Sequence, residues 1–163
     1  MNFIVFPGQG SQKISMGKDL SDNFVEAKEV FEEVNESLDF NLTEIMWGDD
    51  EITLSLTYNA QPALMACGVA SFRVLKKLTG KNLPELANYV CGHSLGEYTA
   101  MTVAGVFSLK ECSQLLRLRG KAMQKAVPVG KGAMAAFIGA DITATLDILK
   151  QVQSFGVCEI AND

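Results

Sequence analysis

The chain has 163 residues, of which 48% are hydrophobic and 20% are charged, a balance typical of a folded globular protein. Its net charge of −5 argues against nucleic-acid binding, which needs a basic surface. No apolar run reaches the ~20 residues of a membrane helix, and the N-terminus lacks the basic start of a signal peptide, so we expect a cytoplasmic protein.

The chain starts with the pattern of a strand followed by that of a helix. Residues 2–6 form an apolar run that Pro7 ends, which predicts a buried strand. Apolar residues then recur at helical spacing from Phe24 to Leu38, which predicts an amphipathic helix. A turn-rich stretch follows at residues 47–50.

A longer helix is predicted at about residues 61–78. Asn59 is a candidate N-cap, and Pro62 falls in the predicted first turn, where its missing N–H costs no hydrogen bond. Residues 63–70 are almost wholly apolar, so we expect this helix to be buried on most sides. Gly80 marks its end.

A second apolar strand is predicted at residues 89–91, and a helix at 97–103 follows it. Ser108 and Glu111 have the spacing of a capping box, which opens a helix that runs to about residue 127. The alternation of strands and helices predicts an α/β fold with a parallel sheet.

The pattern changes near the C-terminus. A strand at 132–138, a helix at 142–152 and a strand at 157–160 predict the start of a separate βαβ-like unit. We therefore divide the chain into a larger α/β domain, residues 1–128, and an incomplete unit, residues 129–163.

Four cysteines are spread along the chain without a CxxC pair: Cys67, Cys91, Cys112 and Cys158. Their surroundings are apolar or helical, so we expect buried, reduced thiols rather than a disulfide or a metal site. A single histidine, His93, also gives little support to a zinc site. We predict no metal and no cofactor.

The stretch Val90–Ala100 reads VCGHSLGEYTA and contains the pattern GxSxG around Ser94. A predicted strand enters this turn and a predicted helix leaves it, which is the setting of a nucleophile elbow. The flanking glycines are needed because side chains would clash in so tight a turn, and the N–H of Leu95 could stabilise an oxyanion there. The alternative is that Ser94 only caps the helix.

Three further stretches accompany this motif: FPGQGSQ at residues 6–12, NAQPAL at 59–64 and RGKAMQ at 119–124. Together with GHSLGEYTA, they resemble the malonyl-CoA:acyl carrier protein transacylases, acyltransferases of fatty acid and polyketide synthesis. The resemblance extends over the whole chain. It implies a parallel-sheet, hydrolase-like core with a nucleophile elbow, followed by the start of a ferredoxin-like small subdomain.

The resemblance also implies a reaction in two steps. The elbow serine takes the malonyl group from coenzyme A, which is a substrate rather than a cofactor, and forms an ester. The phosphopantetheine thiol of acyl carrier protein then receives the group, so that one difficult transfer is divided into two easier ones. Malonyl-CoA and acyl carrier protein are the implied partners.

By motif, the resemblance makes Ser94 the nucleophile and assigns the oxyanion hole to the N–H groups of Gln9 and Leu95. It makes Arg119 the partner of the malonyl carboxylate, and it places Gln61 near the pocket. A guanidinium is a planar, permanently charged fork that matches a carboxylate, and an uncharged acyl group would leave it unpaired. Without the resemblance, the loop of Gln9 would be read as a turn and Arg119 as a surface residue, and for Gln61 capping or packing at a helix start is an equal reading.

Two other residues compete for these roles. Arg117 lies two positions from Arg119, roughly 200° round a helix, so one arginine can face a site while the other meets solvent. His93 is next to Ser94, but neighbouring residues in a tight turn point in different directions. We therefore expect His93 to line the pocket rather than to act as the base.

The general base of the family is a histidine well downstream of the elbow, and this chain ends before that point. The resemblance thus implies an N-terminal half, whose open sheet edge favours association with a C-terminal half or with itself. Without the base, we expect the isolated chain to be slow or inactive. Two alternatives remain open, a serine esterase and a non-catalytic module that binds acyl carrier protein or coenzyme A.

Overall fold

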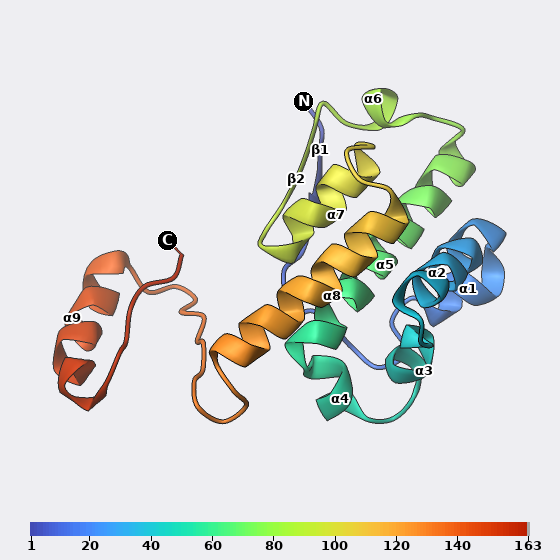
Figure 1. The fold of residues 1–163 in the computed structure, drawn as a ribbon. Coiled ribbons are helices and arrows are strands. Elements are labelled where there is room, and N and C mark those ends of the chain that lie inside the picture. The colour runs from blue at the N-terminus through green and yellow to red at the C-terminus, as the bar shows by residue number, and fades with distance from the viewer. Residues whose placement is uncertain (163) are drawn as a thin grey trace. The chain divides into compact units, whose positions relative to one another are not determined.

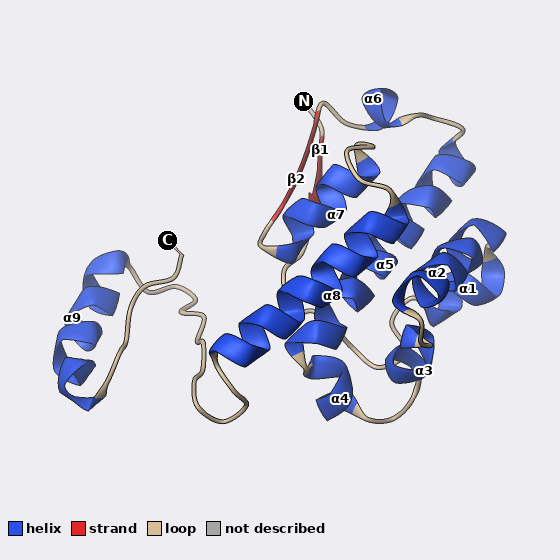
Figure 2. Cartoon of the chain, in the orientation of Figure 1, coloured by secondary structure: helices blue, strands red, loops and turns tan. Residues whose placement is uncertain are grey.

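The computed structural model describes residues 1–162, and the chain divides into two compact units, Met1–Pro128 and the residues from Val129 onward. Figures 1 and 2 show the first unit as a group of helices beside one pair of short strands. In chain order this unit contains β1 (Phe3–Phe6), α1 (Lys18–Asn23), α2 (Val25–Leu38), α3 (Leu42–Trp47), α4 (Glu51–Ser55), α5 (Thr57–Thr79), α6 (Leu83–Leu86), β2 (Tyr89–Gly92), α7 (Leu95–Val103) and α8 (Leu109–Ala126).

The two strands form a parallel sheet, as predicted. Phe3 pairs with Tyr89 and Phe6 pairs with Gly92. On the inner face, Phe6 packs so closely on α5 that a methyl group on Gly68 would lie 3.1 Å from its ring. This contact confirms the expected α/β arrangement, in which helices cover a parallel sheet.

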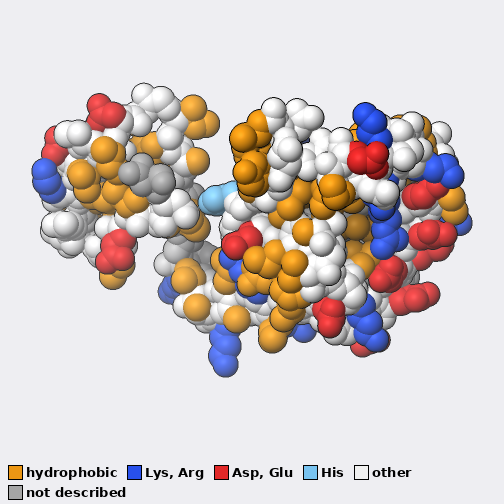
Figure 3. Space-filling view, turned by 90° about the horizontal axis from the view of Figure 1, so that it is seen from above, with side chains coloured by type: hydrophobic (Ala, Val, Ile, Leu, Met, Phe, Trp, Pro, Cys, Tyr) orange, Lys and Arg blue, Asp and Glu red, His pale blue; other side chains and the backbone are white. Residues whose placement is uncertain are grey.

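The outer face of the sheet is apolar and uncovered within the first unit. Phe3, Val5 and Tyr89 are 56%, 66% and 55% exposed, and the rings of Phe3 and Tyr89 stack 5.2 Å apart. Hydrophobic side chains also gather in patches elsewhere on the surface of this unit (Figure 3). Parallel sheets usually have both faces covered, so this face has the composition of an interior surface.

Helix α5 is the centre of the core and packs against α2, α7 and α8. All its residues from 59 to 66 are buried, which confirms the expectation of a helix enclosed on most sides. Helix α2 buries the positions that its spacing predicted, among them Val30 and Val34. The only tryptophan, Trp47, packs edge-on against Phe31 with ring centroids 5.3 Å apart, and its indole N–H donates to the Met16 carbonyl at 3.1 Å.

The predicted start of α5 is wrong. The helix begins at Thr57, so Asn59 is not an N-cap; its side-chain amide instead donates to the Thr53 carbonyl at 2.8 Å. Pro62 is therefore inside the helix rather than in its first turn. The sequence misleads here because partners outside the helix, rather than a local cap, satisfy the polar groups of this segment.

The helix boundaries that depend on local signals agree better with the prediction. Ser108 and Glu111 form the predicted capping box, in which the Glu111 N–H donates to the Ser108 hydroxyl at 3.2 Å and the Ser108 N–H donates to the Glu111 carboxylate at 2.9 Å. Helices α1, α3, α4 and α6 were not predicted. They have four to six residues, too few to show a helical period.

The second unit contains the predicted helix, α9 (Ile142–Val152), followed by the short 3₁₀ helix η1 (Gln153–Phe155). The strands predicted at 132–138 and 157–160 are wrong, because neither segment pairs with another in residues 1–162 and both are exposed. An apolar run becomes a strand only when a neighbour accepts its backbone hydrogen bonds. The ferredoxin-like assignment of this unit stays a prediction.

No helix within residues 1–162 has both the length and the apolar character needed to cross a bilayer. The cysteines are all free thiols, but only two are shielded. Cys67 is largely buried and Cys112 is buried, whereas Cys91 and Cys158 are exposed, so the expectation of four buried thiols is half wrong. Burial, aided by the charge of Asp19, raises the pKa of Cys67 to about 12.

The difference in burial among the four cysteines predicts selective alkylation. At pH 8 in the absence of denaturant, iodoacetamide should modify Cys91 and Cys158 and leave the two shielded thiols unmodified, because the thiolate is the reactive form and burial opposes it. Intact mass spectrometry should show two additions, rising to four in urea. Rapid labelling of Cys67 in the folded chain would contradict the packing described above.

Candidate functional site

Ser94 lies in the turn between β2 and α7, in a backbone conformation that is rare for any residue except glycine. Its φ is 55° and its ψ is −113°. The turn is held by hydrogen bonds on both sides: the His93 N–H donates to the Phe6 carbonyl at 3.2 Å, and the Gly96 N–H donates to the His93 carbonyl at 2.8 Å. A strained conformation costs on the order of 1–3 kcal/mol and persists only where the surroundings fix it.

The two glycines that flank Ser94 are required by the packing of this turn, as predicted. A methyl group on Gly92 would lie 2.1 Å from the carbonyl carbon and oxygen of Gly96. A methyl group on Gly96 would lie 2.3 Å from the carbonyl oxygen of Phe6. The start of α7 therefore touches the end of β1, backbone to backbone, and Ser94 is held at the start of the helix.

The loop after β1 lies against the same turn. A methyl group on Gly8 would lie 2.7 Å from Nδ1 of His93, and the Gln9 side-chain amide donates to the Thr57 hydroxyl at 3.3 Å. In the described part of the chain, neither the N–H of Gln9 nor that of Leu95 donates to a protein acceptor. Both backbone donors are therefore free to bind another group.

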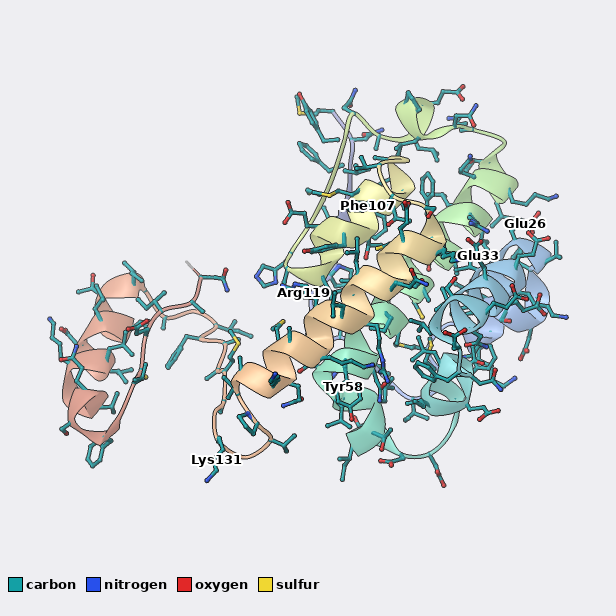
Figure 4. The ribbon with its side chains drawn as sticks, in the orientation of Figure 1. Glu26, Glu33, Tyr58, Phe107, Arg119 and Lys131 are labelled. Atoms are coloured by element: carbon teal, nitrogen blue, oxygen red, sulfur yellow. The ribbon has the colours of Figure 1, made fainter. Side chains whose placement is uncertain are left out.

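Arg119 of α8 is brought to Ser94 and Gln61, as the motifs led us to expect. Its Nη2 donates to the Ser94 hydroxyl at 3.0 Å and its Nη1 donates to the Gln61 side-chain carbonyl at 2.7 Å. Figure 4 shows Arg119 extending from α8 beside the turn before α7. Within residues 1–162, no carboxylate forms an ion pair with this guanidinium, so its charge is available to an anionic ligand.

Gln61 holds this guanidinium from the buried side. It is fully buried in α5, and its amide nitrogen contacts the sulfur of Met123 at 3.3 Å. Because its amide nitrogen contacts Met123 and its side-chain oxygen accepts from Arg119, the Gln61 side chain has one orientation. The amide thus fixes the direction from which Arg119 approaches Ser94.

Arg117 points away from Arg119, but it is only partly exposed and is bonded to α5 rather than free in solvent as expected. Its Nη1 donates to the Tyr58 carbonyl at 2.8 Å and to the Asn59 side-chain oxygen. Its guanidinium carbon lies 4.6 Å from the Phe40 ring centroid and 4.7 Å from that of Tyr58. Burial lowers the pKa of Arg117, which still leaves a guanidinium fully charged at neutral pH.

His93 is exposed and is not bonded to Ser94. Among residues 1–162, the polar partner of the Ser94 hydroxyl is Arg119, whose guanidinium donates and cannot accept a proton. No three metal-ligating side chains come together anywhere in that part of the chain. Among the described residues, the Ser94 hydroxyl thus has a hydrogen-bond donor beside it and no proton acceptor bonded to it.

Two residues that the sequence analysis did not single out complete the site. The Tyr98 ring lies 5.6 Å from the guanidinium carbon of Arg119, and Met123 contacts Gln61. Met123 follows Arg119 by four positions on α8, and Tyr98 lies in the first turn of α7, directly after the turn that carries Ser94. The spacing of four puts Met123 on the same face of α8 as Arg119 and could have identified it.

Comparison with known proteins agrees with this geometry. The model of the acyl transferase domain family matches residues 3–158. The chain belongs to this family. The malonyl CoA-acyl carrier protein transacylase of Bacillus subtilis is 42% identical over 159 residues, which are 97% of this chain and 49% of that protein. The Haemophilus influenzae protein of the same name is 40% identical over 98% of this chain and 50% of its own length.

Solved structures of family members have the same fold. The acyl-carrier-protein S-malonyltransferase of Bartonella henselae is 50% identical with a TM-score of 0.91, and the match covers 100% of this chain and 52% of that one. A malonyl-transacylase solved in complex with its type II PKS acyl carrier protein is 39% identical with a TM-score of 0.84, over 95% of this chain and 49% of that one. The chain thus spans about half the length of the relatives it matches.

The turn at Ser94 makes a prediction about stability. Gly92→Ala should lower the free energy of unfolding by about 3 kcal/mol or more, because its methyl group would collide with the backbone of Gly96, which cannot move aside. Gly80→Ala is the matched control: Gly80 has φ +66° and nothing within 4 Å, so only the strain of about 1 kcal/mol applies. Urea unfolding measures both. Equal losses would mean that the close approach at Gly92 is absent.

Proposed function

We propose that this chain is part of an acyltransferase that moves a malonyl group from coenzyme A to the phosphopantetheine thiol of acyl carrier protein through an ester on Ser94. The observation that carries the proposal is the guanidinium of Arg119, free of acidic partners within residues 1–162 and 3.0 Å from the Ser94 hydroxyl. The names of the similar proteins support the same activity. A free cation beside a serine in a strand–turn–helix setting suits an acyl group that carries its own carboxylate.

In the first half-reaction, Ser94 Oγ attacks the thioester carbon of malonyl-CoA and gives its proton to a general base. The carbonyl oxygen becomes negative, and the free N–H groups of Gln9 and Leu95 are the proposed donors to it. Collapse of the intermediate breaks the carbon–sulfur bond, and the coenzyme A thiolate takes up the proton. The malonyl group is then an ester of Ser94.

In the second half-reaction the thiol of the carrier protein gives its proton to the base and its sulfur attacks the same ester carbon. The bond from that carbon to Ser94 Oγ breaks, and the serine oxygen takes up the proton. Arg119 binds the free carboxylate in both steps, in place of the hydrogen bond that it now gives to Ser94. Gln61 keeps the guanidinium in position, while His93 and Tyr98 lie at the edge of the site. An acetyl group would leave the cation without a partner, which explains a preference for malonyl.

The proton acceptor is the part of the mechanism that these residues do not provide. We propose that it is a histidine of the remaining half of the enzyme, since the chain spans about half the length of its relatives. The outer sheet face of Phe3, Val5 and Tyr89 is where that half, or a second copy of the chain, would pack. A cytoplasmic location and the absence of a metal or cofactor stay predictions.

Intact mass spectrometry of the chain after incubation with malonyl-CoA tests the proposal. We expect slow addition of one malonyl group, faster with added imidazole as an external base, and none in Ser94→Ala. Ordinary turnover by the 163-residue chain would refute the proposal that the general base lies outside these residues. Faster reaction with a neutral aryl ester than with malonyl-CoA would favour an esterase. Capture of acyl carrier protein with no acyl-serine under any condition would favour a binding module.

The role of Arg119 predicts a change in selectivity. Arg119→Ala should lower malonyl labelling of Ser94 by about 100-fold, because the substrate carboxylate loses a charge-assisted partner, and should affect acetyl labelling much less. Rates of acyl-enzyme formation from malonyl-CoA and acetyl-CoA give the ratio. Arg73→Ala, at a surface pair with Glu33, is the control and should leave the ratio unchanged. An equal fall in both labelling rates would mean that Arg119 supports the fold rather than binding the substrate carboxylate.

A further inference from the structure

Pro62 leaves a gap in the hydrogen bonding of α5. In an α-helix each N–H donates to the carbonyl four residues earlier, and proline has no N–H. The carbonyl that loses its donor is that of Tyr58, in the first turn of the helix. This segment also carries Gln61, the residue that holds Arg119.

Arg117 supplies the missing donor from another helix. Its Nη1 lies 2.8 Å from the Tyr58 carbonyl and also donates to the side-chain oxygen of Asn59. The rings of Phe40 and Tyr58 lie 4.6 and 4.7 Å from the guanidinium carbon, so the group has little freedom to turn. One charged side chain therefore joins the start of α5 to α8 at a fixed position.

The same turn of α8 also lies close to the backbone of α5. A methyl group on Gly120 would lie 2.4 Å from the Cα of Tyr58 and 2.8 Å from the carbonyl oxygen of Thr57. Arg117 and Gly120 are three residues apart and share one face of the helix. Arg119 leaves α8 on another side and reaches Gln61, one residue before Pro62. Figure 4 shows Tyr58 at the start of α5 and Arg119 on α8.

We propose that Arg117 is a positioning residue, which replaces the donor missing at Pro62 and so holds Gln61 and Arg119 in the geometry that presents the guanidinium to the substrate carboxylate. The relevance of this geometry to malonyl binding rests on the proposed function. The geometry itself does not, and it can be tested in the chain without any acyl transfer.

The chain has three arginines, Arg73, Arg117 and Arg119, so its arginine Nε–Hε signals form a spectrum simple enough to assign by substitution. We would measure ¹⁵N relaxation of these groups at pH 6 in the wild type, in Arg117→Met and in the control Arg73→Met. Rigid backbone N–H groups have order parameters of about 0.85, and flexible ones have values below about 0.6. We expect the order parameter of the Arg119 Nε–Hε group to be near the rigid value in the wild type and in Arg73→Met, and to fall below about 0.6 in Arg117→Met. A folded Arg117→Met variant with an equally ordered Arg119 would overturn the proposal.

Pro62→Ala gives the second test, because an alanine N–H at position 62 can donate to the Tyr58 carbonyl and make Arg117 dispensable there. The double variant Pro62→Ala/Arg117→Met should recover the order of Arg119, and it should also recover folding if Arg117→Met alone does not fold. A double variant whose Arg119 is no more ordered than in Arg117→Met, or which also fails to fold, would overturn the proposal. If these signals behave as expected and malonyl-CoA still fails to label Ser94 with imidazole present, the positioning role stands and the proposed function falls.

Discussion

The site depends on one close backbone contact, that of Gly96 with the carbonyl of Phe6. Because a methyl group at position 96 would lie 2.3 Å from that oxygen, the start of α7 can lie directly on the end of β1 only when this residue is glycine. The contact places Ser94 where the strand has ended and the helix has just begun. It also places the loop that follows Phe6 against His93, so the backbone donors of Gln9 and Leu95 come from two segments fixed by the same contact.

The features that the sequence predicts well are those fixed by neighbouring residues. The clash of Gly92 with Gly96 beside Ser94, the capping box at Ser108 and the apolar spacing of α2 all act over a few residues, and the structure shows each of them. The start of α5 could not be predicted in this way. Asn59 looks like a cap, but its amide bonds to Thr53, and the proline after it is tolerated because a residue far along the chain bonds to the helix.

In the candidate site too, residues that belong to sequence motifs were predicted, and residues defined by distant contacts were not. The motifs indicated Ser94, Gln61 and Arg119, and the structure joins them by hydrogen bonds, although their chemical roles remain proposals. Arg117 carries the same charge as Arg119 and no motif distinguishes it from a surface residue. Only the tertiary structure reveals its contacts, because the aromatic rings on either side come from segments that precede it by more than 50 residues. The prediction of strands after residue 130 was wrong because a strand also depends on distant residues. It needs a partner strand, which an apolar run alone does not specify.

The electrostatics of the site contrast with those of the chain. With a net charge of −5, the protein as a whole repels anions, yet Arg119 is surrounded by neutral groups: an amide, a hydroxyl and an aromatic ring. These groups orient the guanidinium without neutralising it. The result is a local positive potential, which is the arrangement needed to attract a single carboxylate to one place on an acidic protein.

The position of Trp47 has a spectroscopic consequence. As the only tryptophan, packed against Phe31 and bonded to the Met16 carbonyl, it belongs wholly to the first unit. Its fluorescence therefore reports on the melting of the unit that contains Ser94, whereas circular dichroism adds the helical signal of α9. The two optical signals together distinguish a chain that melts as one cooperative body from one whose units melt separately.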